Sequence, residues 1–467
     1  MSKEMLHKQS QTLKGTKDLA KPERGNSDMK RRRFLGSTLE VAALVALPSN
    51  VAGQRTGRVP RAKPTDRLAG KTLVQLRDQY KSDIFGDFLP FMKKYVIDEQ
   101  YGGFMCNADY HGRQVNQNKL SWFEGRGIWV YSFLYNNLAR ERKYLNVARR
   151  SVEFILRIRP AGEDLWAKEL TREGKALTSA DGEIYGDLFI AEGLAEYSKA
   201  IGERSHWDKA RELVLKCVRL YDRDDYRPTI GQTYLGPNAT PFPGARIQGV
   251  WMVLIRVVTQ MLEMRADSEL ERVAQRAVDA ITKHHYNPEF QLINELLNHD
   301  LSRPQNEYAQ LVYTGHCIEN LWMLMLEAQR LRDDNLFETL AAWFRRHVEV
   351  AWDDVFGGVF RNLQNVDKNI WTLDKVLWAQ EEVLIGCIMI IERTGAPWAK
   401  EMFDRMYRHV RDKYPLKSHG SPLWIYASDR RVTYEAFSRM PKRVENFHHP
   451  RYLMLNLLSL ERMIKKA

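Results

Sequence analysis

The chain has 467 residues, 44% of them hydrophobic and 11% aromatic, a composition that excludes a disordered or fibrous protein. The formal net charge is +12, but residues 1–70 carry 15 Lys and Arg against 6 Asp and Glu, which leaves 12 − 9 = +3 for the other 397 residues. With so small a net charge, residues 71–467 lack the excess of positive charge that is typical of nucleic-acid-binding proteins, and we expect no nucleic acid partner.

The N-terminal region, residues 1–70, is expected to be a basic leader followed by a linker. Within it, residues 29–54 read "MKRRRFLGSTLEVAALVALPSNVAGQ", a basic start, a short apolar run and then small residues. "RRRFLG" is similar to a twin-arginine export signal, so we expect a periplasmic or secreted protein. The apolar run is far shorter than the roughly 20 residues of a membrane span. The alternative is an unstructured basic tail on a cytoplasmic protein.

The body, residues 71–467, is expected to be a single domain made of helices. Apolar residues recur at helical spacing in segments broken by Gly, Pro, Asn and Asp. We count twelve such segments, which start near residues 73, 119, 143, 185, 205, 244, 267, 310, 334, 375, 397 and 448. Short extended pieces are predicted at "YGGFMCNADYHGR" (101–113) and "FGGVFRNLQN" (356–365), where paired glycines allow tight turns.

An internal repeat relates the two halves of the chain. "YGGF" at 101–104 recurs as "FGGVF" at 356–360, and "KLSWFEGRGIW" at 119–129 aligns with "KVLWAQEEVLI" at 375–385. Repeated helix pairs must bury their apolar faces on neighbouring pairs, either in a solenoid or in a closed ring. Because no regular 34-residue consensus is present, we predict an all-α (α/α)6 barrel, a toroid of six helical hairpins with short β-hairpin loops.

In such a ring every second helix is internal, and we expect those starting near 119, 185, 244, 310, 375 and 448 to be the internal ones. Their starts would gather the following polar residues around one cavity: Arg126, Asp187, Arg246, His316, Glu319, Glu382 and His448. His316 and Glu319 share one helix face. A helix N-terminus favours a neutral histidine, as a general base requires, and we expect Glu319 to orient the His316 ring. The alternative is a polar helix start without a catalytic role.

Other candidates are open to two interpretations. Arg126 and Glu382 occupy one repeat position with opposite charge, which suits either a ligand site or a buried ion pair. Trp122, Trp378 and Trp424 suit either sugar stacking or core packing. Asp187 suits either the cavity lining or a helix cap. The four cysteines lie too far apart in sequence for a C-x-x-C metal site and are expected in the core.

Five segments, in order, resemble motifs of the N-acylglucosamine 2-epimerase family: "YGGFMCNADYHGR", "WFEGRGIWVYSFLYN", "TGHCIENLWML", "LWAQEEVLIG" and "FHHPRYLM". The resemblance implies an (α/α)6 barrel acting on a carbohydrate without a metal or redox cofactor, as a monomer or homodimer. It makes His316 and His448 the proton-transferring histidines, Glu319 and Glu382 supporting carboxylates, and Arg126 the arginine at the sugar oxygen. The expected substrate-binding residues are Trp122, Asp187, Trp378, Trp424 and Arg451.

We therefore expect a carbohydrate 2-epimerase or aldose-ketose isomerase that acts through an enediolate. His449 stands where the family usually has an apolar residue, so His448 is preferred of the two. "YGDLFIAEG" lacks a histidine that some subgroups carry, and a glycine-rich nucleotide loop is missing, so ATP regulation is not expected. The alternatives are a glycoside hydrolase, with a carboxylate pair drawn from Asp187, Glu319 and Glu382, or an inactive sugar-binding barrel.

Overall fold

The computed structural model describes residues 65–178, 183–227, 235, 238–425, 427–428 and 443–466. The predicted export signal at 29–54 and most of the predicted linker lie outside these residues. The end of that linker is corrected, because strands β1 (Arg67–Leu68) and β2 (Lys71–Thr72) pair as an antiparallel hairpin. Strand β1 also contacts helix α13 (Pro397–Lys413), so the folded part begins before residue 71.

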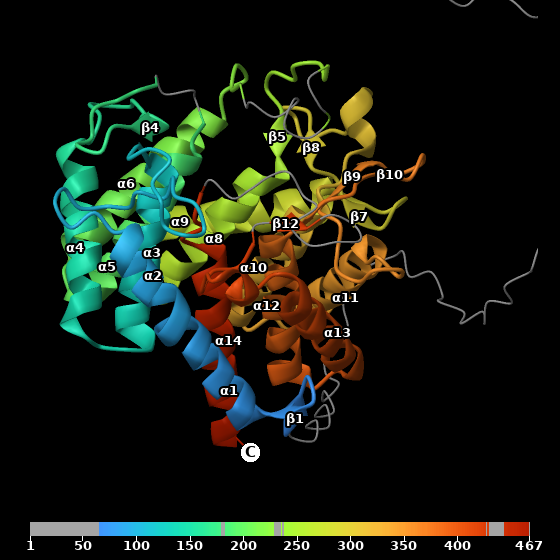
Figure 1. Cartoon of the computed structure of the whole chain (residues 1–467). Helices are drawn as coiled ribbons and strands as arrows, with labels where there is room; N and C mark the ends of the chain where they lie inside the picture. Colours follow the sequence, from blue (N-terminus) through green and yellow to red (C-terminus); the bar gives the residue numbers. More distant parts are fainter. Residues whose placement is uncertain are drawn as a thin grey trace, which may run out of the picture. The chain divides into compact units, whose positions relative to one another are not determined.

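The described residues contain twelve helical rods, whose contacts divide them into an inner and an outer layer. Figure 1 labels the helices. The inner rods are α3 (Ser121–Asn137), α5 (Tyr185–Ile201), α8 (Gln248–Met264), α10 (Thr314–Leu331), α12 (Leu377–Thr394) and α14 (His448–Lys466). The outer rods are α4 (Arg142–Arg157), α6 (Arg204–Tyr221), α9 (Ser268–Asp279) continued by η2 (Ala280–His285), α11 (Asp334–Ala351), α13, and a continuous rod of α1 (Leu73–Lys81), η1 (Ser82–Phe88) and α2 (Leu89–Tyr95).

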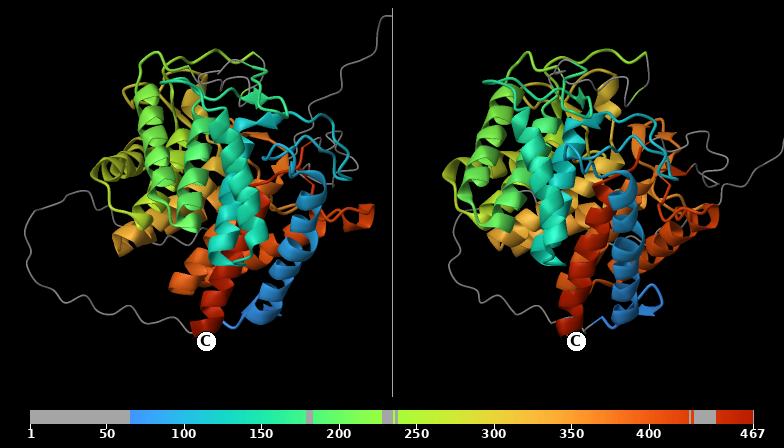
Figure 2. Two further views of the ribbon diagram at one scale, coloured as in Figure 1. Left: turned by 90° about the vertical axis from the view of Figure 1, so that its left-hand side faces the viewer. Right: turned by 60° about the vertical axis from the view of Figure 1, so that its left-hand side comes forward.

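Contacts between helices close the inner layer into a ring. Each inner helix contacts the next, from α3 through α5, α8, α10 and α12 to α14, and α14 contacts α3. Each outer rod packs on one inner helix; α1, for example, lies beside α14 in both views of Figure 2. The predicted (α/α)6 barrel and its six internal helices are therefore confirmed, with observed starts within a few residues of the expected ones.

Burial explains why the helices divide into two layers. Outer helix α4 buries Tyr144, Ala148, Val152 and Ile155, which recur every three or four residues and therefore lie on one face. Inner helices are buried on all sides; every residue from Leu377 to Ile391 of α12 is buried. Such all-round burial is what a helix enclosed by neighbours requires.

Short strands connect the rods. They form two-stranded antiparallel ladders that pair β3 (Lys119–Leu120) with β4 (Glu169–Leu170), β5 (Arg246–Ile247) with β8 (Leu296–Leu297), β6 (Tyr286–Asn287) with β7 (Leu292–Ile293), β9 (Asn362–Asn365) with β10 (Ile370–Thr372), and β11 (Lys375–Val376) with β12 (Ala427–Ser428). Two 3₁₀ turns, η3 (Glu307–Gln310) and η4 (Lys417–His419), complete the connections. Strands β3, β5 and β11 lead directly into inner helices, so the ladders fix where those helices begin.

The internal repeat has a structural counterpart. In each copy a buried lysine binds an aspartate and a glycine carbonyl of the preceding hairpin: Lys119 with Asp98 and Gly102, and Lys375 with Asp353 and Gly357. The Lys–Asp distances are 3.0 and 2.9 Å. Both glycines have positive φ, 81° and 75°, the conformation that glycine adopts readily. The repeated Lys-x-x-Trp element therefore anchors a hairpin onto the start of an inner helix.

Two remaining expectations concern membranes and cysteines. None of the helices in the described part of the chain has the length and apolarity needed to cross a bilayer. All four cysteines are buried and none forms a disulfide, as expected of core residues.

Candidate active site

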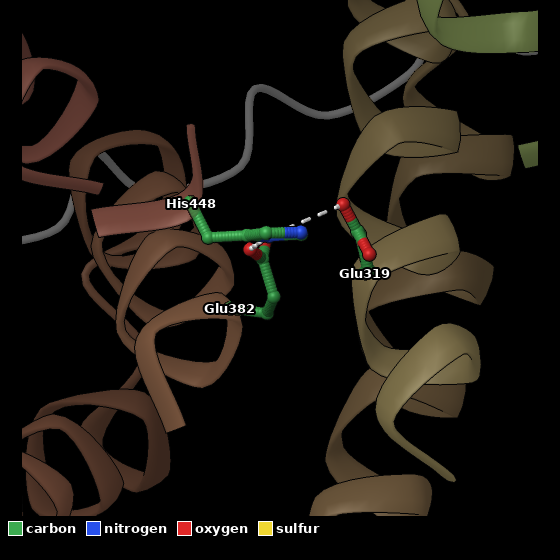
Figure 3. A group of neighbouring side chains, drawn as sticks. All are labelled: Glu319, Glu382 and His448. Carbon is green, nitrogen blue, oxygen red and sulfur yellow. Dashed lines mark hydrogen bonds and ion pairs between the residues drawn. The ribbon is translucent and has the colours of Figure 1, made fainter. Parts of the chain in front are cut away.

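Three inner helices, α10, α12 and α14, bring Glu319, Glu382 and His448 together near their starts (Figure 3). His448 is the first residue of α14, His316 the third of α10, and Glu382 the sixth of α12. The start of α14 is held by Glu445, whose Oε1 accepts from the backbone N–H groups of Phe447 and His448 at 3.0 and 3.3 Å. The predicted convergence of residues far apart in sequence is therefore observed for this group.

Arg451, one turn after His448, is the centre of the cluster. Its Nη2 lies 2.5 Å from Glu319 Oε1, 2.6 Å from Glu382 Oε1 and 3.0 Å from His448 Nδ1. One guanidinium nitrogen carries only two hydrogens, so it cannot donate to three acceptors. The two carboxylates are closer, and His448 Nδ1 lies 3.0 Å from Glu382 Oε1. We therefore assign the Nδ1 proton to His448, donated to Glu382, which leaves the lone pair on Nε2.

Burial sets the charges in this cluster. Burial lowers the pKa of His448 to about 3, although Glu319 opposes this shift, so the imidazole is neutral near pH 7. Burial also raises the pKa of Glu382, and the Arg451 charge opposes that shift. Arg451 is 1% exposed, and its pKa is raised because Glu382 and Glu319 outweigh the effect of burial. Neutral His448 thus lies beside the ion pairs that Arg451 forms with Glu319 and Glu382.

His316 has a different partner from the one expected. Its Nδ1 lies 3.0 Å from Oε1 of Glu295, which is fully buried. The prediction that Glu319 orients His316 is wrong, because Glu319 binds Arg451 instead. Sequence reasoning missed Glu295 because it lies outside the helices, between β7 and β8. Its one signal is that it is the only charged residue in the apolar stretch "QLINELLN".

Trp378 lies between the two histidines. Its ring centroid is 5.9 Å from that of His316 and 5.2 Å from that of His448, with tilts of 36° and 34°. Gly315 makes room for this ring, since a Cβ there would lie 2.7 Å from Trp378 Cη2. Two histidines therefore border one indole ring, and each has a carboxylate on its Nδ1.

Arg126 is held by aromatic rings. Its guanidinium carbon lies 4.1 Å from the Phe189 ring centroid, 4.8 Å from that of Phe447 and 5.2 Å from that of Trp122. Burial lowers its pKa, while Glu445 and Glu319 act in the opposite direction. Its Nε has no hydrogen-bond partner among the described residues. The Arg126 guanidinium thus packs against the rings of Trp122, Phe189 and Phe447.

Three predicted residues lie elsewhere. Asp187 does not join the cluster: it pairs with Lys216 of outer helix α6 at 2.7 Å and accepts from the backbone of Trp166. Arg246 donates to the backbone carbonyls of residues 244 and 223, so it braces a loop. Trp424 packs on His449, at 4.6 Å between ring centroids. Asp187 and Arg246, which we expected to face the central cavity, instead bind neighbouring parts of the fold.

His449 forms a second histidine–carboxylate pair. Its Nδ1 lies 2.5 Å from Oε1 of Glu381, and both side chains are buried. Burial lowers the pKa of His449 to about 4 and raises that of Glu381 well above its usual value. The pair lines a pocket together with Trp378 and Trp424. His448, unlike His449, contacts Glu382 and Arg451, and the preference for His448 as the catalytic residue stays a prediction.

The cluster also resembles a metal site by composition. Ligand atoms of Glu319, Glu382 and His448 lie within 4.8 Å of one another. Arg451 Nη2 already contacts one atom of each residue: Glu319 Oε1, Glu382 Oε1 and His448 Nδ1. The guanidinium therefore supplies the positive charge that a cation would otherwise bring, and we assign no metal to this group.

Comparisons with known proteins agree with the fold and the motifs. The family model described as N-acylglucosamine 2-epimerase matches residues 102–450. An N-acylglucosamine 2-epimerase of Mus musculus is 26% identical over 292 residues, or 58% of this chain and 65% of that protein. The chain thus spans slightly less than two thirds of the length of this relative.

Solved structures of cellobiose 2-epimerases share the fold. The enzyme of Spirochaeta thermophila DSM 6192 aligns over 84% of this chain and 98% of its own, with a TM-score of 0.70 and 17% identity. That of Bacillus thermoamylovorans B4167 aligns over 83% and 100%, with a TM-score of 0.69 and 15% identity. These identities support the barrel alone, whereas the family model covers most of the chain. The chain belongs to the N-acylglucosamine 2-epimerase family.

Proposed function

We propose that this protein is a carbohydrate 2-epimerase or aldose-ketose isomerase that works by proton transfer through an enediolate. The observation that carries the proposal is the pair of histidines at one tryptophan ring, each with a carboxylate on Nδ1. Inverting C2 requires one group to remove a proton and another to return one from the opposite face. Two histidines on either side of a bound sugar meet this need.

The steps follow from the residues present. With the sugar in its open-chain form, Nε2 of one histidine takes the proton from C2. The electrons of the C2–H bond then form a C1=C2 double bond, and O1 takes the negative charge. Arg126 would stabilise this enediolate, since its charge is directed at an oxygen that becomes anionic in the transition state. Return of a proton to the opposite face of C2, with re-formation of the C1=O bond, gives the epimer. Return of a proton to C1, with loss of the proton on O2 to form C2=O and protonation of O1, gives the ketose.

The carboxylates argue against the hydrolase alternative. A glycosidase needs one carboxylic acid and one carboxylate on opposite sides of the glycosidic bond. Glu319 and Glu382 are both bound to Arg451, and Asp187 is bound to Lys216; all three are at most 3% exposed. Carboxylates neutralised and buried in this way are poor candidates for that pair.

The test is deuterium exchange. The full chain is incubated in D2O with mannose, glucose, N-acetylmannosamine and cellobiose, and deuterium at C1 and C2 is followed by NMR. We expect incorporation at C2 or C1 with intact glycosidic bonds, and none with His316→Ala. Hydrolysis of cellobiose, or binding of every sugar without exchange in the wild type, would refute the proposal in favour of a hydrolase or a sugar-binding barrel.

We also propose export through the twin-arginine signal at residues 29–54, and a monomer or homodimer as the active form. Replacing Arg32 and Arg33 with lysine should retain the protein in the cytoplasm if the signal is used. Light scattering of the purified protein gives the oligomeric state. Equal export of the lysine variant would contradict the first expectation, and a larger assembly the second.

A further inference from the structure

We propose that Glu295 is a positioning residue: it holds the Nδ1 proton of His316 and thereby keeps a lone pair on Nε2 for proton transfer. The catalytic consequence rests on the proposed function. The placement of the proton does not, because it is a property of the protein without substrate.

The direction of the hydrogen bond follows from taking Glu295 as an ionised carboxylate. Glu295 Oε1 lies 3.0 Å from His316 Nδ1, and an ionised carboxylate can only accept. A neutral imidazole carries one N–H, so a donor at Nδ1 leaves Nε2 unprotonated. The His316 side chain is 18% exposed, whereas Glu295 is fully buried. The carboxylate therefore contacts the ring from its buried side.

Glu295 is held in place by its backbone. Its N–H donates to the carbonyl of Leu311 at 3.0 Å, just before α10, and its carbonyl accepts from the N–H of Gln248 at 2.8 Å, the first residue of α8. Gln248 in turn donates through Nε2 to the carbonyl of His316 at 3.1 Å. The backbone of Glu295 thus connects the starts of α8 and α10 through hydrogen bonds. This gives the carboxylate the rigid support that a positioning role requires.

Gly249 also lies against the His316 ring. A Cβ at this position would lie 3.1 Å from both His316 Nδ1 and Tyr185 Oη, so an alanine would displace these side chains by a few tenths of an ångström. Gly249 lies inside α8, where alanine is the better helix former. Gly249→Ala therefore disturbs the surroundings of His316 Nδ1 without lowering the helix propensity of α8.

The test compares Glu295→Ala, Glu295→Gln and Gly249→Ala with the wild type, in the full chain. The matched control is Gly86→Ala, a helical glycine in η1 whose Cβ would meet only Ser82 Oγ, at 3.7 Å. Nitrogen-15 NMR of the imidazole, with His316→Ala to assign the signal, reports which nitrogen carries the proton at pH 8. Steady-state kinetics with the sugar that shows exchange give kcat and KM separately.

We expect the wild type to carry the proton on Nδ1 and Glu295→Ala to shift it toward Nε2. That variant should lose about 10²-fold in kcat with KM within about threefold, since proton placement acts on the reacting complex. Glu295→Gln keeps an accepting oxygen and should lose less. Gly249→Ala should lower kcat about tenfold with unchanged stability, and Gly86→Ala should match the wild type in both.

Two results would overturn the inference. The first is an unchanged proton position in Glu295→Ala, and the second is a loss expressed in KM alone. If the wild type exchanges no sugar, the proposed function fails, and the NMR comparison still decides whether Glu295 places the proton.

Discussion

Replacing Arg451 with methionine is expected to destabilise the barrel strongly, and more so at high pH. Methionine has a similar length and no charge, so the change removes the guanidinium and leaves Glu319 and Glu382 without their cation. Both carboxylates are at most 3% exposed, and both lie within 2.6 Å of Arg451 Nη2. Removing one member of a buried ion pair typically costs about 3–5 kcal/mol, because the remaining charge is uncompensated.

The pH dependence follows from Glu382. Burial raises its folded pKa above the ordinary 4.5, and Arg451 limits that increase, so the variant raises the folded pKa further. A group with a raised folded pKa contributes its stability fully below its unfolded pKa and loses it as the pH rises. Keeping Glu382 protonated in the folded variant therefore costs more free energy at pH 8 than at pH 5, because a glutamate of the unfolded chain ionises more completely at the higher pH.

The assay is urea unfolding followed by circular dichroism at pH 5 and pH 8. The control is Arg462→Met on the same helix, which breaks a two-contact ion pair with Glu392 at 2.8 Å each, with the arginine side chain 52% exposed. We expect that control to lose about 1 kcal/mol or less at either pH. A loss below about 1 kcal/mol for Arg451→Met at pH 8, or an equal loss at both pH values, would refute the reasoning.

Three further predictions concern the site and the fold. His316→Ala and His448→Ala should each lower turnover at least about 10²-fold with an unchanged circular dichroism spectrum, and activity within a few-fold of wild type would remove that histidine from the mechanism. Trp378→Ala should raise KM for the sugar, as steady-state kinetics would show, because the ring bordering both histidines is lost. Gly125→Ala should destabilise by about 1–3 kcal/mol or more in urea unfolding, because its Cβ would lie 2.3 Å from the Phe189 carbonyl carbon, whereas Gly86→Ala should be neutral.

The sequence predicted the barrel well because a barrel of helices requires apolar residues at helical spacing, and that spacing can be read directly from the sequence. Apolar spacing located all twelve rods, and the internal repeat aligned Lys119 with Lys375. Partners within the site depend instead on which way each side chain points, which spacing along one helix does not determine. Glu319 follows His316 by one turn, yet it turns to Arg451 on another helix, and the His316 partner comes from a loop. A contact set by tertiary structure leaves little trace in local sequence.

The neighbouring residues 448 and 449 show how the fold separates similar side chains. Both histidines meet a glutamate of α12, at Glu382 and Glu381 respectively, so sequence alone gives them equivalent partners. Successive residues of a helix lie about 100° apart, and α14 has the barrel centre on one side and the outer rod of α1 and η1 on the other. His448 therefore meets Arg451 and Trp378, while His449 packs against Phe88 of η1. The difference between a candidate catalytic histidine and its neighbour is thus one step of helix rotation.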